Sequence, residues 1–201
     1  AAVVNLAGLV LHRDGGRREM ARVNVRGAMR VAELARANPG CHVVHASTSG
    51  VGAPFDYYET KREAEDGLTA YCREHGVPLA CLRFPQLHGA GPDCEGFRRS
   101  TAVIRRCLAG RPRLQFGGTV CFADVDRVAA AVVRAAETRA CGVFDLGGHA
   151  YPVPRYLSEV SDLLGHSARC CTATTVPDRV AQGVAAGMRR LGVASVAGLT
   201  A

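Results

Sequence analysis

The stretch CHVVHASTSGVGAPFDYYETK, residues 41–61, decides the fold predicted for this chain. It begins with an apolar run, Cys41–Ala46, whose length and composition are typical of a buried strand. The run stops at the polar segment STSG, residues 47–50, and a helix is predicted from about Tyr57 to His75. A continuous apolar strand followed by a helix is typical of a parallel sheet that is covered on both faces.

The same alternation of strand and helix continues on both sides of this stretch. It indicates an α/β domain with a doubly wound, Rossmann-like parallel sheet. Ligands of such sheets bind at the carboxyl ends of the strands, where loops 7–8, 47–52 and 85–92 are predicted. The other predicted strands are 3–7, 78–83, 114–116, 120–121 and 142–146, and the other predicted helices are 18–37, 96–108, 124–138, 153–164 and 177–191.

Length, charge and composition limit the function. The chain has 201 residues, enough for one domain or one and a half. Its formal net charge is +7, and its arginines are spread over several predicted helices, which favours solvated helix faces first and a phosphate-bearing ligand second. Trp is absent, which argues against a stacking surface for nucleic acid. No apolar run reaches the roughly 18 residues of a membrane helix, so neither nucleic acid nor a membrane is an expected partner.

The nine cysteines do not form a recognisable framework. Their number is odd, no C-x-x-C is present, and no His/Cys cluster has zinc spacing, so no metal site is predicted. Several lie in apolar runs, where cysteine behaves as a small hydrophobic residue. We therefore expect a reducing, cytoplasmic location. The chain does not begin with Met and its first residues already have a strand pattern, so we expect it to lack the beginning of a longer protein.

The chain has a single lysine, Lys61, four residues after Tyr57. Residues i and i+4 share a helix face, so the ammonium group and the phenol are expected side by side. A nearby cation lowers a tyrosine pKa from about 10, which makes the phenol a proton donor and acceptor for an alcohol–ketone pair. Thr48, before this helix, has a hydroxyl suited to binding the substrate oxygen, or alternatively to capping the strand end.

Seven segments follow one another in the order of a known set of motifs. They are VVNLAG (3–8), NVRG (24–27), VVHASTS (43–49), YYETK with Glu65 (57–65), LRFP and HGAGP (82–92), FADVDRVA (122–129) and FDLGG (144–148). This set resembles the extended short-chain dehydrogenase/reductase family, also described as NAD-dependent epimerases/dehydratases, over nearly the whole chain. The segments around residues 6–10, 176–177 and 198–200 look most like its dihydroflavonol-reductase and 3β-hydroxysteroid-dehydrogenase branch.

The resemblance implies roles for named residues. Tyr57 would be the general acid/base, Lys61 would lower its pKa and hold the nicotinamide ribose of NAD or NADP, Thr48 would bind the substrate oxygen, and Asn24 would support the active-site helix. Hydride would pass between the cofactor and a secondary alcohol or ketone, either a sugar nucleotide or a steroid- or flavonoid-like substrate. The implied cofactor contacts are Leu6, Ala7, Gly8, Ala46, Ser47, Tyr57, Lys61, Phe84, Pro85 and Leu87, and the implied substrate contacts are Ser49, Gly50 and His88.

The resemblance also implies an organisation. Residues 1–86, rejoined by about 119–148, would form an N-terminally truncated Rossmann-like domain, and residues 87–118 and 149–201 a small substrate-binding lobe. Helices 18–37 and 57–75 resemble the pair that forms the family's homodimer interface; simple packing of these helices on the sheet is the alternative.

Several features depart from the family pattern. The 201 residues contain no G-x-x-G-x-x-G phosphate loop, which leaves open a second hypothesis, a catalytically inactive member that binds or scaffolds. Thr48 lacks the T-D-E context of the dehydratase branch, so water elimination is discounted. Arg127 and Asp124 stand where the family often has Asp and His. Arg83 is equally suited to a substrate phosphate and to a structural salt bridge.

Overall fold

The computed structural model describes residues 1–10, 16–52, 56–89, 119–152, 155–156 and 159. The chain divides into two compact units, residues 1–89 with 123–148 and residues 90–122 with 149–201. Each unit is described by itself below. The substrate-binding role assigned to the second unit stays a prediction.

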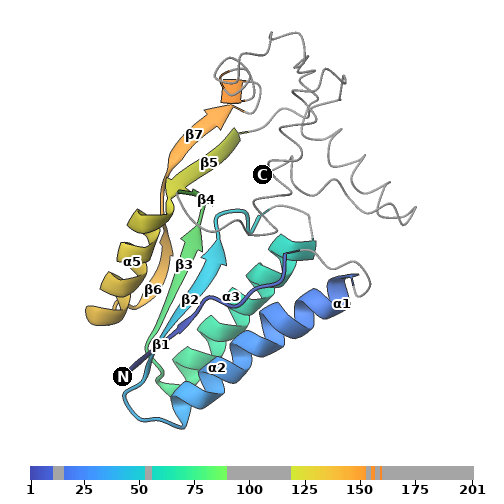
Figure 1. Cartoon of the computed structure of the whole chain (residues 1–201). Helices are drawn as coiled ribbons and strands as arrows, with labels where there is room; N and C mark the ends of the chain where they lie inside the picture. Colours follow the sequence, from blue (N-terminus) through green and yellow to red (C-terminus); the bar gives the residue numbers. More distant parts are fainter. Residues whose placement is uncertain (11–15, 53–55, 90–118, 153–154, 157–158, 160–201) are drawn as a thin grey trace. The chain divides into compact units, whose positions relative to one another are not determined.

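The first unit is built on a sheet of four parallel strands in the order β1-β2-β3-β6 (Figure 1). The strands are β1 (Ala2–Asn5), β2 (His42–Thr48), β3 (Leu79–Phe84) and β6 (Gly142–Asp145). All three pairings are parallel, with Val44 opposite Val4 on one side and opposite Ala80 on the other. The prediction of a parallel α/β sheet is confirmed.

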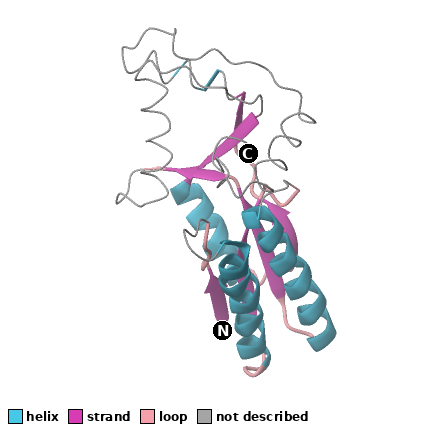
Figure 2. Cartoon of the chain, turned by 90° about the vertical axis from the view of Figure 1, so that its right-hand side faces the viewer, coloured by secondary structure: helices cyan, strands magenta, loops and turns pink. Residues whose placement is uncertain are grey.

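Helices cover both faces of this sheet, as predicted. On one face, Val43 packs with α2 (Gly27–Arg36) and α3 (Asp56–His75) in a core that includes Leu68. On the other face, Val44 packs with α5 (Val125–Glu137). Because neighbouring strand residues point to opposite faces, these two valines place the helices on opposite sides. Figure 2 shows the sheet with long helices in front of it.

The long helix predicted over residues 18–37 is present, but it contains a wide turn. It consists of α1 (Gly16–Ala21), a π-helical segment η1 (Arg22–Arg26) and α2. The joining residues Ala21 and Arg26 keep right-handed helical dihedral angles, so the helix is not interrupted. Single π-turns inside α-helices often mark functional sites. Periodicity alone could not predict this turn.

The strands at the sheet edges are more exposed than their apolar sequences predicted. Every residue of β2 is buried, whereas all four residues of β6 are exposed and β1 buries only Asn5. An edge strand has one neighbour instead of two, so its side chains are less covered. No helix among the described residues is long and apolar enough to cross a membrane.

Two further short strands differ from the prediction. Residues 86–88, predicted as loop, form β4 (Gln86–His88), and β7 (His149–Pro152) was not predicted. In the second unit, β7 pairs antiparallel with β5 (Thr119–Asp124). The helices predicted over 96–108 and 177–191 and the strand over 114–116 lie outside the described residues, as does most of the helix predicted over 153–164.

The helix predicted from Asp124 is present as α5, and it explains one departure from the family pattern. The Asp124 carboxylate accepts hydrogen bonds from the backbone N–H groups of Asp126 (2.9 Å) and Arg127 (3.4 Å). An aspartate in this position satisfies helix N–H groups that have no partner inside the helix. Asp124 is therefore an N-cap, and the Arg127 side chain is exposed.

Candidate active site

The candidate site is formed where β2 ends and α3 begins. Thr48 is the last residue of β2 and is 9% exposed, and Tyr57 is the second residue of α3. The Thr48 hydroxyl accepts a hydrogen bond of 3.3 Å from the backbone N–H of Gly50. This bond caps the strand end and leaves the hydroxyl hydrogen available to a ligand, so both interpretations of Thr48 are compatible with the geometry.

Lys61 is buried inside this site. Its side chain is 3% exposed, and Nζ donates a hydrogen bond of 2.7 Å to the carbonyl oxygen of Ala46 on β2. Burial lowers the pKa of Lys61 from its ordinary value of 10.5 to about 8. An ammonium has three hydrogens, and the bond to Ala46 is the one hydrogen bond of Nζ among the described residues. Two donors therefore remain for a ligand.

The predicted effect of Lys61 on Tyr57 is wrong for this structure. Burial, together with the neighbouring phenol of Tyr58, raises the pKa of Tyr57 to about 12 instead of lowering it. Desolvation disfavours the phenolate, and the buried ammonium does not offset it here. In this structure the Tyr57 phenol is therefore protonated at neutral pH and can act as a proton donor.

A glycine keeps the space beside the Lys61 ammonium clear. A Cβ at Gly8 would lie 3.3 Å from Lys61 Nζ and 3.8 Å from the side-chain oxygen of Asn24. A side chain at this position would fill the space in front of the two free ammonium donors. The arrangement fits a group with paired hydroxyls, such as the ribose of a nicotinamide nucleotide.

Asn24, on the π-helical segment, fixes the loop that carries Gly8. Its side-chain oxygen accepts from Leu9 N (2.7 Å) and its amide donates to Leu9 O (3.0 Å). The same amide donates to the Thr60 hydroxyl (3.0 Å), which in turn donates to the backbone carbonyl of Tyr57 (2.9 Å). Asn24, which is 1% exposed, thus connects the loop that carries Gly8 with the first turn of α3.

The open question about Arg83 is answered by Glu65. The Arg83 guanidinium donates to both carboxylate oxygens of Glu65, with distances from 2.5 to 3.2 Å. Burial raises the pKa of Glu65, but the hydrogen bonds and the positive charge of Arg83 outweigh it, so the pKa is lowered overall. Arg83 forms the structural salt bridge, the second of the two predicted alternatives.

A buried histidine, His45, lies on β2 near Lys61 and Glu65. His45 is 1% exposed, and its Nδ1 accepts a hydrogen bond of 3.2 Å from the Asn5 side-chain amide. Burial and the positive charge of Lys61 lower its pKa to about 4. His45 is therefore neutral at physiological pH and is packed in the interior of the first unit.

The other predicted contact residues surround this centre to different degrees. Ser47 and Pro85 are buried, and Phe84 is half-buried at the end of β3. The Ser49 backbone N–H donates to Phe84 O at 2.9 Å, which ties the loop after β2 to the sheet. The remaining predicted contacts have their side chains or backbone exposed, apart from the half-buried Gly50: Leu6, Ala7, Gly8, Ser49, Leu87 and His88.

Some residues of the site were not singled out from the sequence. Asn5 bonds both His45 and the Ala7 backbone N–H, and Thr60 links Asn24 to Tyr57. Both had a signal in the sequence: Asn5 is the polar end of an apolar strand, and Thr60 is the threonine of the segment YYETK that carries Tyr57 and Lys61. A third residue, Tyr58, had no such signal.

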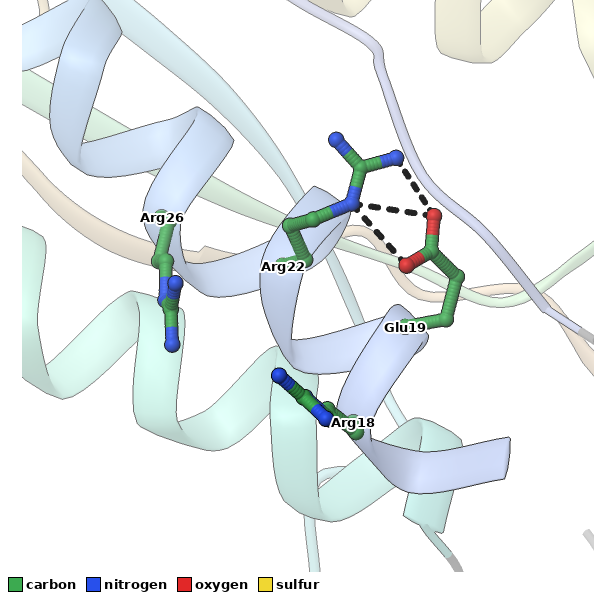
Figure 3. Close-up of a pocket in the computed structure, with 4 residues that line it drawn as sticks. All are labelled: Arg18, Glu19, Arg22 and Arg26. Carbon is green, nitrogen blue, oxygen red and sulfur yellow. Dashed lines mark hydrogen bonds and ion pairs between the residues drawn. The ribbon is translucent and has the colours of Figure 1, made fainter. Parts of the chain in front are cut away.

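A hollow on the surface of α1 and η1 does not belong to this site. It has a volume of about 300 Å³ and is lined by Arg18, Glu19, Arg22 and Arg26 (Figure 3). Figure 3 shows the Arg22 side chain folded onto Glu19, and Arg22 Nε bonds the carboxylate at 2.9 and 3.0 Å. Exposed pairs of this kind contribute little to stability or binding. No group of three or more potential metal ligands occurs among the described residues.

Solved structures share this fold. MoeE5 in complex with UDP-glucose and NAD is 28% identical, with a TM-score of 0.64, and the match covers 87% of this chain and 66% of that one. UDP-glucuronic acid 4-epimerase from Bacillus cereus in complex with NAD is 22% identical (TM-score 0.65; 87% and 61% covered). UDP-N-acetylglucosamine 4-epimerase from Methanobrevibacter ruminantium M1 is 18% identical (TM-score 0.63; 83% and 61% covered). The chain thus spans less than two thirds of the length of these proteins.

Sequence comparison identifies the family. No curated protein sequence matches the chain. The model of one protein family matches residues 1–147, which include β1 to β6 and every predicted catalytic residue. These matches do not test the finer placement in the dihydroflavonol-reductase and 3β-hydroxysteroid-dehydrogenase branch, which stays a prediction. The chain belongs to the NAD dependent epimerase/dehydratase family.

Proposed function

We propose that the chain is part of an NAD-dependent enzyme that oxidises a secondary alcohol of a sugar nucleotide to a ketone, or reduces such a ketone to the alcohol, as an epimerase or dehydrogenase. The observation that carries this proposal is the buried Lys61, whose ammonium faces the space kept clear by Gly8. This cation is buried, lies one helix turn after the half-buried Tyr57, and has a lowered pKa, and perturbed pKa values of this kind are concentrated at functional sites. Sugar nucleotides are the preferred substrate class because the similar solved structures are named for UDP-sugars.

NAD, when bound, would supply the hydride acceptor and donor. Lys61 would hold the ribose hydroxyls with its two remaining donors. Tyr57, protonated at neutral pH, would transfer its phenol proton to a substrate carbonyl oxygen and would take it back from the alcohol in the reverse direction. Thr48 would orient the same oxygen through its hydroxyl hydrogen.

The experiment compares the full-length protein with its Tyr57→Phe variant. Fluorescence titration with NADH should show binding to both, since the phenol hydroxyl is assigned to proton transfer and not to cofactor affinity. Turnover of UDP-glucose, UDP-glucuronic acid and UDP-N-acetylglucosamine should fall by at least about 10³-fold in the variant. Retained turnover would exclude Tyr57 as the acid/base. Failure of the wild type to bind NADH would favour the alternative of a non-catalytic family member.

We also propose that the protein is a homodimer through helices 18–37 and 57–75. Leu34 on α2 is 65% exposed, and a partner packed on this helix pair would cover its side chain. Analytical ultracentrifugation of the wild type and of Leu34→Glu tests this proposal. The variant should shift toward the monomer, and a wild type that sediments as a monomer at micromolar concentration would refute it.

A further inference from the structure

Tyr58, the neighbour of the proposed acid/base, lies directly on the backbone of Gly50. A Cβ built on Gly50 would be 2.7 Å from Tyr58 Cδ1 and 2.9 Å from Cζ, and closer still to Cε1. Real Cβ atoms do not approach other atoms so closely, so any larger residue at position 50 requires the ring or the loop to move. The ring is half-buried, and it meets the Tyr57 ring edge-on, with centroids 5.3 Å apart and planes at 61°.

Gly50 is in turn bonded to the other proposed catalytic hydroxyl. Its backbone N–H donates to Thr48 Oγ1 at 3.3 Å, and the preceding residue, Ser49, is tied to β3 through Phe84 O. A path of direct contacts therefore runs from the Thr48 hydroxyl through Gly50 and the Tyr58 ring to Tyr57. This path joins the strand end to α3 by packing, and not only along the chain.

We propose that Gly50 and Tyr58 are a matched pair of positioning residues that sets the separation of the Thr48 and Tyr57 hydroxyls. The proposal rests on the proposed function, because it assigns a use to the two hydroxyls. A proton donor and an orienting hydroxyl must both reach the same substrate oxygen, and displacements of about 1 Å in such groups can cost 10²-fold in rate. Glycine at position 50 is the condition for the ring to lie there.

The test is a double-mutant cycle on turnover. Gly50→Ala should lower kcat by at least about 10-fold, because its Cβ displaces the ring. In the Tyr58→Ala background the same substitution should cost less than about 2-fold, since the ring is gone. In the Tyr58→Phe background, which keeps the ring carbons, the 10-fold cost should return. The matched control is Gly52→Ala in the same loop, where a Cβ would meet no atom within 4 Å, and which should leave kcat unchanged.

A second readout does not depend on turnover. The ultraviolet absorbance of tyrosinate is followed with pH, and the contribution of Tyr57 is obtained by subtracting the curve of Tyr57→Phe. Gly50→Ala should move the Tyr57 titration to lower pH, because displacing the ring admits water to the phenol, and Gly52→Ala should not. Melting curves of all variants show whether they remain folded.

The outcomes separate the two proposals. The proposed function would be refuted if the wild type showed no turnover. The matched pair would still be supported if Gly50→Ala lowered the Tyr57 pKa and Gly52→Ala did not. Equal effects of Gly50→Ala and Gly52→Ala would overturn the matched pair. So would a cost of Gly50→Ala that stays the same in the Tyr58→Ala background, because the contact between the two residues would then not be its cause.

Discussion

Replacing Lys61 by methionine should stabilise the protein at neutral pH while it abolishes turnover. Burial lowers the pKa of Lys61 from 10.5 to about 8 in a side chain that is 3% exposed. At about 1.4 kcal/mol per pKa unit, carrying the charge in the folded state costs about 3 kcal/mol. Methionine has a similar length and no charge, and it leaves the Ala46 carbonyl unpaired at a cost of about 1 kcal/mol. The expected net gain at pH 7 is about 2 kcal/mol.

The gain should disappear as the pH rises. Below pH 8 the folded and unfolded forms of the wild type both bind the lysine proton, so the burial cost is present in full. Between pH 8 and 10.5 the unfolded form keeps the proton while the folded form has lost it, so the wild type becomes more stable with increasing pH. Lys61→Met lacks this titration. The stability difference should therefore change sign between about pH 8 and pH 10.

Urea denaturation of both proteins at several pH values from 7 to 10 measures the difference. Tyrosines with raised pKa values are present in both proteins, so their contribution largely cancels. The control is Arg62→Met, an exposed neighbour, which should change stability by less than about 0.5 kcal/mol at every pH. Because Lys61 is the only lysine of the chain, ¹³C-labelled lysine gives a single NMR signal and its pKa directly. A pKa near 10.5, or a difference that does not vary with pH, would refute the reasoning.

Four further substitutions test the surrounding structure. Glu65→Gln should destabilise the protein by about 2 kcal/mol at pH 7, because it leaves a guanidinium half-buried without its carboxylate. The loss should shrink as the pH falls through the lowered carboxylate pKa, and denaturation at pH 7 and pH 4 checks it; equal stability of both proteins at pH 7 would contradict it. Asn24→Ala should speed amide hydrogen exchange of Leu9, because the Leu9 N–H donates a hydrogen bond to the Asn24 side chain. Unchanged exchange would mean that other contacts hold the loop. Leu68→Ala, at a fully buried position, should cost about 2–5 kcal/mol, whereas Leu34→Ala should cost less than about 0.5 kcal/mol at monomeric concentrations. Similar losses in these two variants would contradict the assignment of the core.

The sheet and its helices were predictable because their signals are local. The apolar run before Thr48 and the helix from Tyr57 to His75 follow from composition and period, and the structure has them within one or two residues. The exposed strand β6 was less predictable. It contains the apolar residues Val143 and Phe144, and their exposure follows from the position of β6 at the edge of the sheet, where β3 is its one neighbour in that sheet.

The chemistry of the site was predictable in its residues and not in its electrostatics. The i, i+4 spacing places Tyr57 and Lys61 on one helix face, but it does not predict that Lys61 is buried and Tyr57 half-buried. Burial raises the pKa of the phenol and lowers that of the ammonium, and this reverses the effect that spacing alone predicted for Tyr57. The contact between Gly50 and Tyr58 also has no sequence signal, because it joins a loop to a helix across space.

Four buried polar residues of the site are costly to bury, and this lowers the free energy of unfolding relative to an apolar core. Asn24, His45, Lys61 and Glu65 are each less than 5% exposed, and apolar side chains of similar size would cost less to bury. Natural proteins keep such unfavourable choices where activity depends on them. If these residues serve the reaction, removing the charge of Lys61 must lower turnover and raise the free energy of unfolding. A variant in which turnover and the free energy of unfolding both fall would show that Lys61 is a structural residue.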